Sequence, residues 1–369
     1  MKGRTLKTTL TVLAVILLIR AILPTGVEWY VNRALTKAEN YSGYVGDIDL
    51  NLWRGAYEIE DIRIVKINSD LEIPFFAAKR LDLSLLWSAL FRGALVGEIY
   101  AYDPEINFTD GESEGKKQSG ASENWLSIAD DLFPLKIDKL VIENGKISFS
   151  NLDAKPPIRI ALYDIEIEAY NLANNKSGIS DRTATASGRA KTLGQGEVTI
   201  SAVASPETAK PTFDLNVEAR QVALKVYEDL FNYYAPFTLE AGTLDLAAEI
   251  AANEGKLKGY VKPVLNNVDV FSWKGDIEED GKGFFGGLKE MLAGFLAEIF
   301  ENQKRDQLAT KIPVEGTIDN IDIDNAAAFF GILRNAFVES INAQVESTVS
   351  LEDAESLEKT EKEDQQKKE

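Results

Sequence analysis

The chain has 369 residues, a formal net charge of −19 and a hydrophobic content of 45%. This acidic balance excludes nucleic acid as a partner, because phosphate binding depends on clustered Lys and Arg side chains. The sequence contains neither Cys nor His. Disulfides, thiolate nucleophiles and Cys-ligated zinc are therefore excluded, and the commonest general base and transition-metal ligand is missing.

The first element, residues 5–23, is predicted to be a single transmembrane helix. Residues 8–19 carry no charge, which is short for a span of about 20 apolar residues, but basic residues at both ends can reach the interface. Lys2, Arg4 and Lys7 place the N-terminus in the cytoplasm. A cleaved signal peptide is the alternative, but no pair of small residues marks a cleavage site near residues 20–24. The anchor residues are Leu10, Val12, Val15, Leu17 and Leu18.

Residues 133–150 define the pattern that recurs along the chain. Apolar residues alternate with polar ones on both sides of Asn144-Gly145, a pair that tolerates positive φ and closes hairpins. Residues 41–66, 96–108, 237–250 (with Gly242) and 311–323 (with Gly316) repeat this pattern. The sequence therefore predicts a β protein built from repeated hairpins.

Further strands are predicted at 71–83, at 158–167, three times within 183–221, and at 255–271. Residues 27–38, 222–234, 284–300 and 326–345 have helical periodicity. The predicted organisation is a cytoplasmic stub and anchor (1–26), an N-terminal β-hairpin region (27–108), a flexible linker (109–124), a repeated β region with amphipathic helices (125–345) and an acidic disordered tail (346–369).

No set of residues predicts catalysis. Asp319, Asp322 and Asp324 suggest calcium, but they lie on a predicted strand without the closed loop that Ca²⁺ needs. Serine nucleophiles lack a His base, and no phosphate-binding glycine loop occurs. We therefore expect no enzyme, no cofactor and no metal site.

Several segments together resemble one known family. VNRAL and YSGYVGDIDLNLWRGAYEIEDIRI within residues 31–64, LKIDKLVIENGKISF, LEAGTLDL, GKLKGYVKP and KIPVEGTID follow one another in the order found in the AsmA-like envelope proteins of Gram-negative bacteria. The resemblance covers nearly the whole chain before the tail. It implies a single-pass inner-membrane protein whose bulk is periplasmic and whose elongated, curled antiparallel β-groove carries phospholipid acyl chains, as in bridge-like lipid-transfer proteins, in outer-membrane homeostasis. Other envelope proteins are possible partners.

About twelve strands at roughly 4.8 Å give a predicted groove about 60 Å long. The candidate lining residues are Leu135, Ile137, Ile147, Phe149, Leu215, Val217, Leu244 and Leu246. Alternation alone also fits a sandwich or barrel closed around its own side chains. The alternative function is therefore a non-enzymatic envelope assembly scaffold with a self-filled β core.

Overall fold

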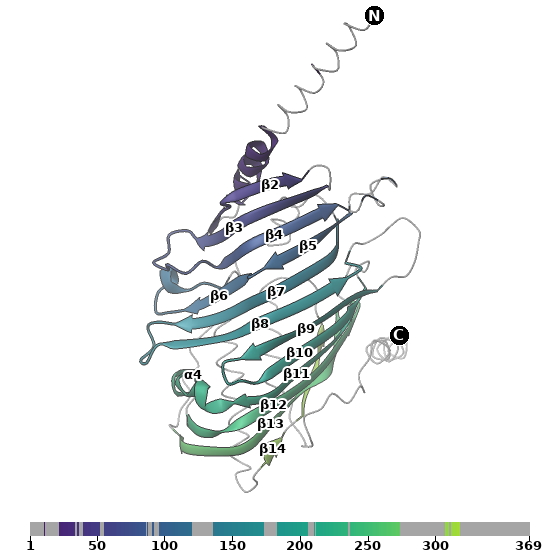
Figure 1. Ribbon diagram of the computed structural model, residues 1–369. Helices are drawn as coiled ribbons and strands as arrows, with labels where there is room; N and C mark the ends of the chain where they lie inside the picture. Colours follow the sequence, from purple (N-terminus) through teal and green to yellow (C-terminus); the bar gives the residue numbers. More distant parts are fainter. Residues whose placement is uncertain are drawn as a thin grey trace, which may run out of the picture.

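The computed structural model describes residues 22–33, 35–36, 40–51, 55–85, 96–119, 136–172, 183–205, 212–234, 237–273, 307–309 and 311–317, with Thr11, Trp87, Phe91 and Lys210. This part of the chain is mainly β, as its alternating pattern predicts, and its strands form one mostly antiparallel sheet (Figure 1). The predicted anchor (5–23), the helices at 284–300 and 326–345, the three aspartates at 319–324 and the acidic tail lie outside the described residues, apart from Thr11, Ile22 and Leu23 in the anchor segment.

The strands are β1 (Tyr41–Tyr44), β2 (Asp47–Asn51), β3 (Ala56–Lys66), β4 (Phe76–Leu85), β5 (Val96–Tyr102), β6 (Glu105–Asp110), β7 (Lys136–Asn151), β8 (Ile158–Tyr170), β9 (Ala184–Thr192), β10 (Glu197–Ala204), β11 (Phe213–Ala223), β12 (Phe237–Asn253), β13 (Lys256–Trp273), β14 (Gln307–Ala309) and β15 (Ile312–Thr317). The helical segments are residues 22–33, η1 (Glu114–Lys116), η2 (Leu224–Tyr227) and α4 (Glu228–Tyr234). The helix predicted at 27–38 is thus confirmed at 27–33, and the one predicted at 222–234 is confirmed from Leu224 on, because Val222 and Ala223 end β11.

The strands follow one another across the sheet in chain order. β1 and β2 lie end to end on β3, β5 and β6 on β7, and β14 and β15 on β13. The fifteen strands therefore occupy twelve successive positions. Eleven spacings of roughly 4.8 Å make the sheet about 53 Å wide. The sheet is twisted, and β11–β13 curve round at its C-terminal end (Figure 1).

The hairpin predicted at residues 133–150 is wrong. β7 runs without a turn from Lys136 to Asn151, and Asn144, with a φ of 55°, forms a bulge within it. Gly242 (φ 119°) lies in the same way at a register shift within β12, whereas Gly316 lies within β15 without any shift of register. The physical reason is that a bulge and a tight turn both require a residue with positive φ, so the same residue types serve for either.

These bulges form a line across the sheet, which we call the bend line. Residues with positive φ interrupt β3, β7, β8, β11, β12 and β13, and one lies between β5 and β6. The register places Tyr102 opposite Glu143 and Gly145 opposite Ile165. The Nδ2 group of Asn144 donates a hydrogen bond to Oδ1 of Asp103 across this line. Its members are Asp61, Asp103, Asn144, Asp164, Gln221, Gly242 and Asn267. Because bulges bend strands, the bend line divides the longer strands into two segments.

The described part of the predicted linker, residues 109–119, folds back onto the sheet. Gln118 is buried, and its backbone exchanges two hydrogen bonds with Thr109, of 2.7 and 2.9 Å. Lys116 Nζ lies 2.5 Å from Asp153 Oδ1, and Lys66 Nζ donates to Lys117 O at 2.7 Å. These contacts attach residues 109–119 to the sheet, although their polar composition predicts a flexible linker.

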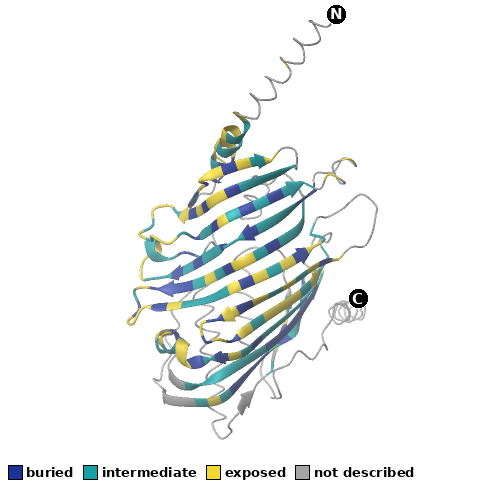
Figure 2. Ribbon diagram, in the orientation of Figure 1, coloured by how far each residue is buried: buried dark blue, intermediate teal, exposed yellow. Residues whose placement is uncertain are grey.

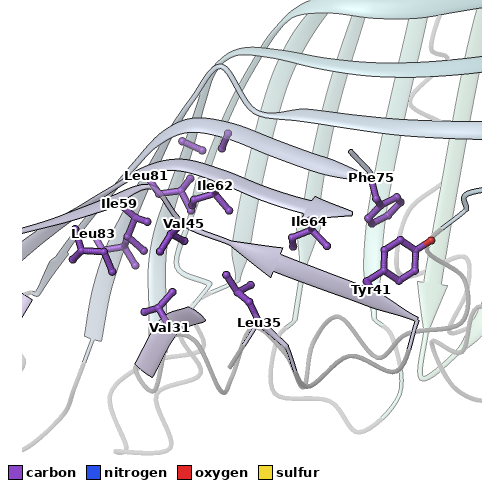
Figure 3. Packing of buried hydrophobic residues seen from close by; sticks show 13 residues of the cluster. Val31, Leu35, Tyr41, Val45, Ile59, Ile62, Ile64, Phe75, Leu81 and Leu83 are labelled. Atoms are coloured by element: carbon purple, nitrogen blue, oxygen red, sulfur yellow. The ribbon is translucent and has the colours of Figure 1, made fainter. Parts of the chain in front are cut away.

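Among the residues that the structure describes, the largest buried cluster lies on the N-terminal strands. Val31 and Leu35, from the helical N-terminal segment, pack on one face of β2–β4 (Figure 3). Asn32 holds this segment in place, because its Oδ1 accepts a hydrogen bond of 3.0 Å from Val45 N–H. The helical segment thus covers the sheet at its N-terminal end.

Candidate functional site

The candidate site is one face of the sheet, which the strand register makes continuous. Residues paired across neighbouring strands lie on the same face, so the pairing can be followed from one strand to the next. One row of partners crosses all twelve positions and contains only apolar residues and glycine. This central row is Ile48, Ile59, Leu81, Ala101, Ile142, Ile167, Gly188, Ile200, Val217, Ala248, Val261 and Ile312.

A second row on the same face has the same character. It consists of Tyr57, Leu83, Ile99, Leu140, Ala169, Ala186, Ala202, Leu215, Ile250, Gly259 and Val314. Burial raises the pKa of Tyr57 well above its usual range, as expected for a phenol surrounded by apolar neighbours. The two rows define what we call the apolar face.

The register places seven of the eight predicted lining residues on the apolar face. Val217 belongs to the central row and Leu215 to the second row. The other five occupy flanking positions of the same face, and Leu135 lies outside the described residues. These five are Ile137, Ile147, Phe149, Leu244 and Leu246.

The apolar face is covered at its ends and open in its middle. Along the central row the exposed fraction is 2% at Ile59, 36% at Ile200 and 7% at Ala248. Ile147, beyond the bend line, is 38% exposed. Burial classes alternate along β7 and β8, as expected of strands with two different faces (Figure 2). The middle strands therefore present apolar side chains that the described chain only half covers.

The sheet curls at the edge where α4 lies, between β8 and β12 (Figure 1). Leu230 of α4 packs against Phe149 and Ile158, which belong to β7 and β8, and α4 also contacts β12. In a flat sheet β8 and β12 would be about 19 Å apart, whereas a helix with its side chains is roughly 10–12 Å across. Because one helix contacts both strands, their ends converge at this edge.

The opposite face is mostly polar and carries ion pairs between neighbouring strands. The row between the two apolar rows reads Asp49, Glu58, Asp82, Tyr100, Val141, Glu168, Ser187, Ser201, Asn216, Glu249, Tyr260 and Pro313. Arg189 lies 2.5 Å from Glu166, Lys191 lies 2.8 Å from Asp164, and both pairs are largely exposed. Such pairs stabilise little, and they mark this face as exposed to water at β8 and β9. At β12 and β13 the same face is buried, with Glu249 0% and Tyr260 2% exposed.

The polar face also has a depression of about 610 Å³. Its charged lining residues are Glu143, Glu166, Glu168 and Arg189, and uncharged residues of β7, β8 and β9 complete it. It is shallow and open to solvent. Among the described residues, no three acidic side chains are grouped so that they could hold a metal ion.

The sequence interpretation missed two parts of the apolar face. Residues of β3–β6, such as Ile59 and Ile99, alternate clearly, and their pattern could have identified them. The positions on β9, which include Ala184, Ala186 and Ala190, are small and alternate with Thr, Ser and Arg. Alanine gives a weak hydrophobic signal, so only the register reveals that these positions belong to the face.

Among the helices that the structure describes, none combines the length and apolar character needed to cross a bilayer. A scan against models of known protein families found no match, and a search of curated proteins found no similar sequence.

Proposed function

We propose that this chain is a membrane-anchored, non-enzymatic protein whose sheet forms a groove for the acyl chains of phospholipids. The observation that carries the proposal is the central row, which crosses twelve strand positions without a polar side chain. Burying apolar surface is worth about 25 cal/mol per Å², so a half-exposed apolar face of this width needs a cover. Acyl chains are a cover that matches its chemistry and extended shape.

The resemblance to AsmA-like envelope proteins supports the same proposal and adds its setting. We propose an inner-membrane anchor near residues 5–23, a periplasmic sheet and a role in supplying phospholipid for outer-membrane homeostasis. A sheet about 53 Å wide holds several lipids side by side but is short for a complete bridge across the periplasm. The proposed role is therefore that of a partial conduit or shuttle that works with other envelope proteins.

The test is native mass spectrometry of the purified protein combined with extraction of bound lipid. We expect stoichiometric phospholipid in the parent and its loss in a Leu215→Asp, Val217→Asp variant. If each Asp displaces contacts with about three methylene groups, at about 0.8 kcal/mol each, affinity should fall roughly 50-fold per substitution.

The matched control carries Thr199→Asp and Ser201→Asp, which add the same charges to exposed positions on the polar face of neighbouring β10. This control should keep its lipid, and both variants should keep the parent's β-sheet circular dichroism. A parent without lipid that also leaves a hydrophobic dye unbound would refute the groove and favour the scaffold with a self-filled core.

A further inference from the structure

The connection between β4 and β5 is unusually apolar for a segment that joins two strands. Residues 86–95 read LWSALFRGAL, with Arg92 as the single charged residue. Connections run over the protein surface and are commonly polar. Trp87 is nevertheless 42% exposed and Phe91 85% exposed. The cost of exposing these rings to water points to another environment for them.

The two rings are held together and against the sheet. Phe91 N–H donates a hydrogen bond of 3.0 Å to Trp87 O, and the ring centroids are 6.3 Å apart. Trp87 also lies over Gly55, where an added Cβ would be 3.1 Å from the indole. The pair is therefore attached to the sheet through Trp87, and it projects from the sheet into solvent.

A second aromatic pair lies on the helical segment 22–33. Trp29 is 63% exposed and Tyr30 is 48% exposed, and the Arg33 guanidinium carbon lies 5.5 Å from the centroid of a Trp29 ring. Val31, the next residue, belongs to the same buried cluster as Leu83 of β4, and the two lie on the same side of Figure 3. Both aromatic pairs thus extend from one end of the sheet. We call Trp29, Tyr30, Trp87 and Phe91 the aromatic corner.

We propose that the aromatic corner rests in the interfacial layer of a lipid bilayer. Trp and Tyr prefer this layer because they combine an apolar ring with a polar group, and a cation beside Trp29 suits anionic headgroups. The charge-free residues 8–19 end two residues before the helical segment, so the proposed anchor brings the bilayer to this end of the sheet.

This inference rests on the proposed function, because it uses the same anchor, and it adds a second point of attachment. With one helix alone the sheet could pivot about its anchor. With Trp87 and Phe91 also in the interface, the first strands of the apolar face are held at the bilayer surface. A lipid can then pass from the bilayer onto the apolar face.

The natural chain has no Cys, so Phe91→Cys can be labelled with a single polarity-sensitive fluorophore. The full-length protein is placed in vesicles of phosphatidylethanolamine and phosphatidylglycerol, with flotation to establish that it is bound. We expect the emission to shift to shorter wavelength and to be quenched by nitroxides placed near the lipid headgroups. The matched control is Ser201→Cys, which is exposed on the polar face and should show neither effect.

Emission and quenching at position 91 equal to those at position 201, in chains that float with the vesicles, would overturn the proposal. Disulfide formation between two chains at position 91 would also overturn it, because a second copy would then occupy the corner. The lipid-binding test is independent, since Leu215→Asp and Val217→Asp change bound lipid without touching the corner. A parent chain that carries no phospholipid, while position 91 is still quenched by the nitroxides, would count against the groove alone.

Discussion

The backbones of β12 and β13 approach closely at Gly259. An ideal Cβ built on this glycine lies 2.2 Å from Glu249 O and 2.8 Å from Ile250 Cα. Both contacts are with backbone, so no rotamer change can relieve them and the two strands must separate. Overpacking of this kind typically costs 1–3 kcal/mol, and we expect Gly259→Ala to lower the free energy of unfolding by about 2–3 kcal/mol.

Gly26 provides the matched control with the same added methyl group. No heavy atom lies within 4 Å of its ideal Cβ, and it sits in the helical segment 22–33. Ala is favoured over Gly in a helix by about 1 kcal/mol, so Gly26→Ala should leave the midpoint of urea unfolding unchanged or raise it. Intrinsic fluorescence of the full chain would report both midpoints. A Gly259→Ala midpoint equal to the parent's would refute the close register of β12 and β13.

Two further predictions test the bend line and the tie between residues 109–119 and the sheet. Asn144→Ala should cost about 1 kcal/mol because Ala is strained at positive φ, whereas Asn144→Gly should be tolerated; equal urea midpoints for Ala and Gly would contradict the bulge. The hydrogen bond from Lys116 lowers the pKa of Asp153 in the folded protein. The ionised carboxylate therefore stabilises the fold at pH values above its unfolded pKa, and this stabilisation is lost as the pH falls through the lower folded pKa. Asp153→Asn should therefore show a smaller loss of stability than the parent between about pH 5 and about pH 2, and identical acid profiles would argue against this pair.

The fold class could be predicted because alternation is a property of each strand alone. The single sheet needed more, since pairing depends on contacts between distant residues. Asn144-Gly145 illustrates the difficulty: the apolar positions shift from Leu140 and Ile142 to Ile147 and Phe149, and either a turn or a bulge can produce that shift. The bulge is identified only by the pairing of β7 with β8, which continues on both sides of a register shift at Gly145.

The candidate site shows a similar limit. Leu215, Val217, Leu244 and Leu246 could be predicted because they are large and alternate with polar residues. The parallel pairing of β5 and β6 with β7 could not be predicted, because it joins strands separated by the long segment 111–135. That junction is nevertheless what makes the apolar face continuous across the sheet.

The chain-order topology has a consequence for how such a protein can change in size. Each strand pairs only with its immediate neighbours, so the stability of the described sheet is approximately a sum of nearest-neighbour terms, as in repeat proteins. An antiparallel pair added or removed among β8–β13 would lengthen or shorten the sheet by about 10 Å and leave the remaining pairings intact. Gene duplication of a strand pair is then a direct route to longer and shorter versions of the same architecture.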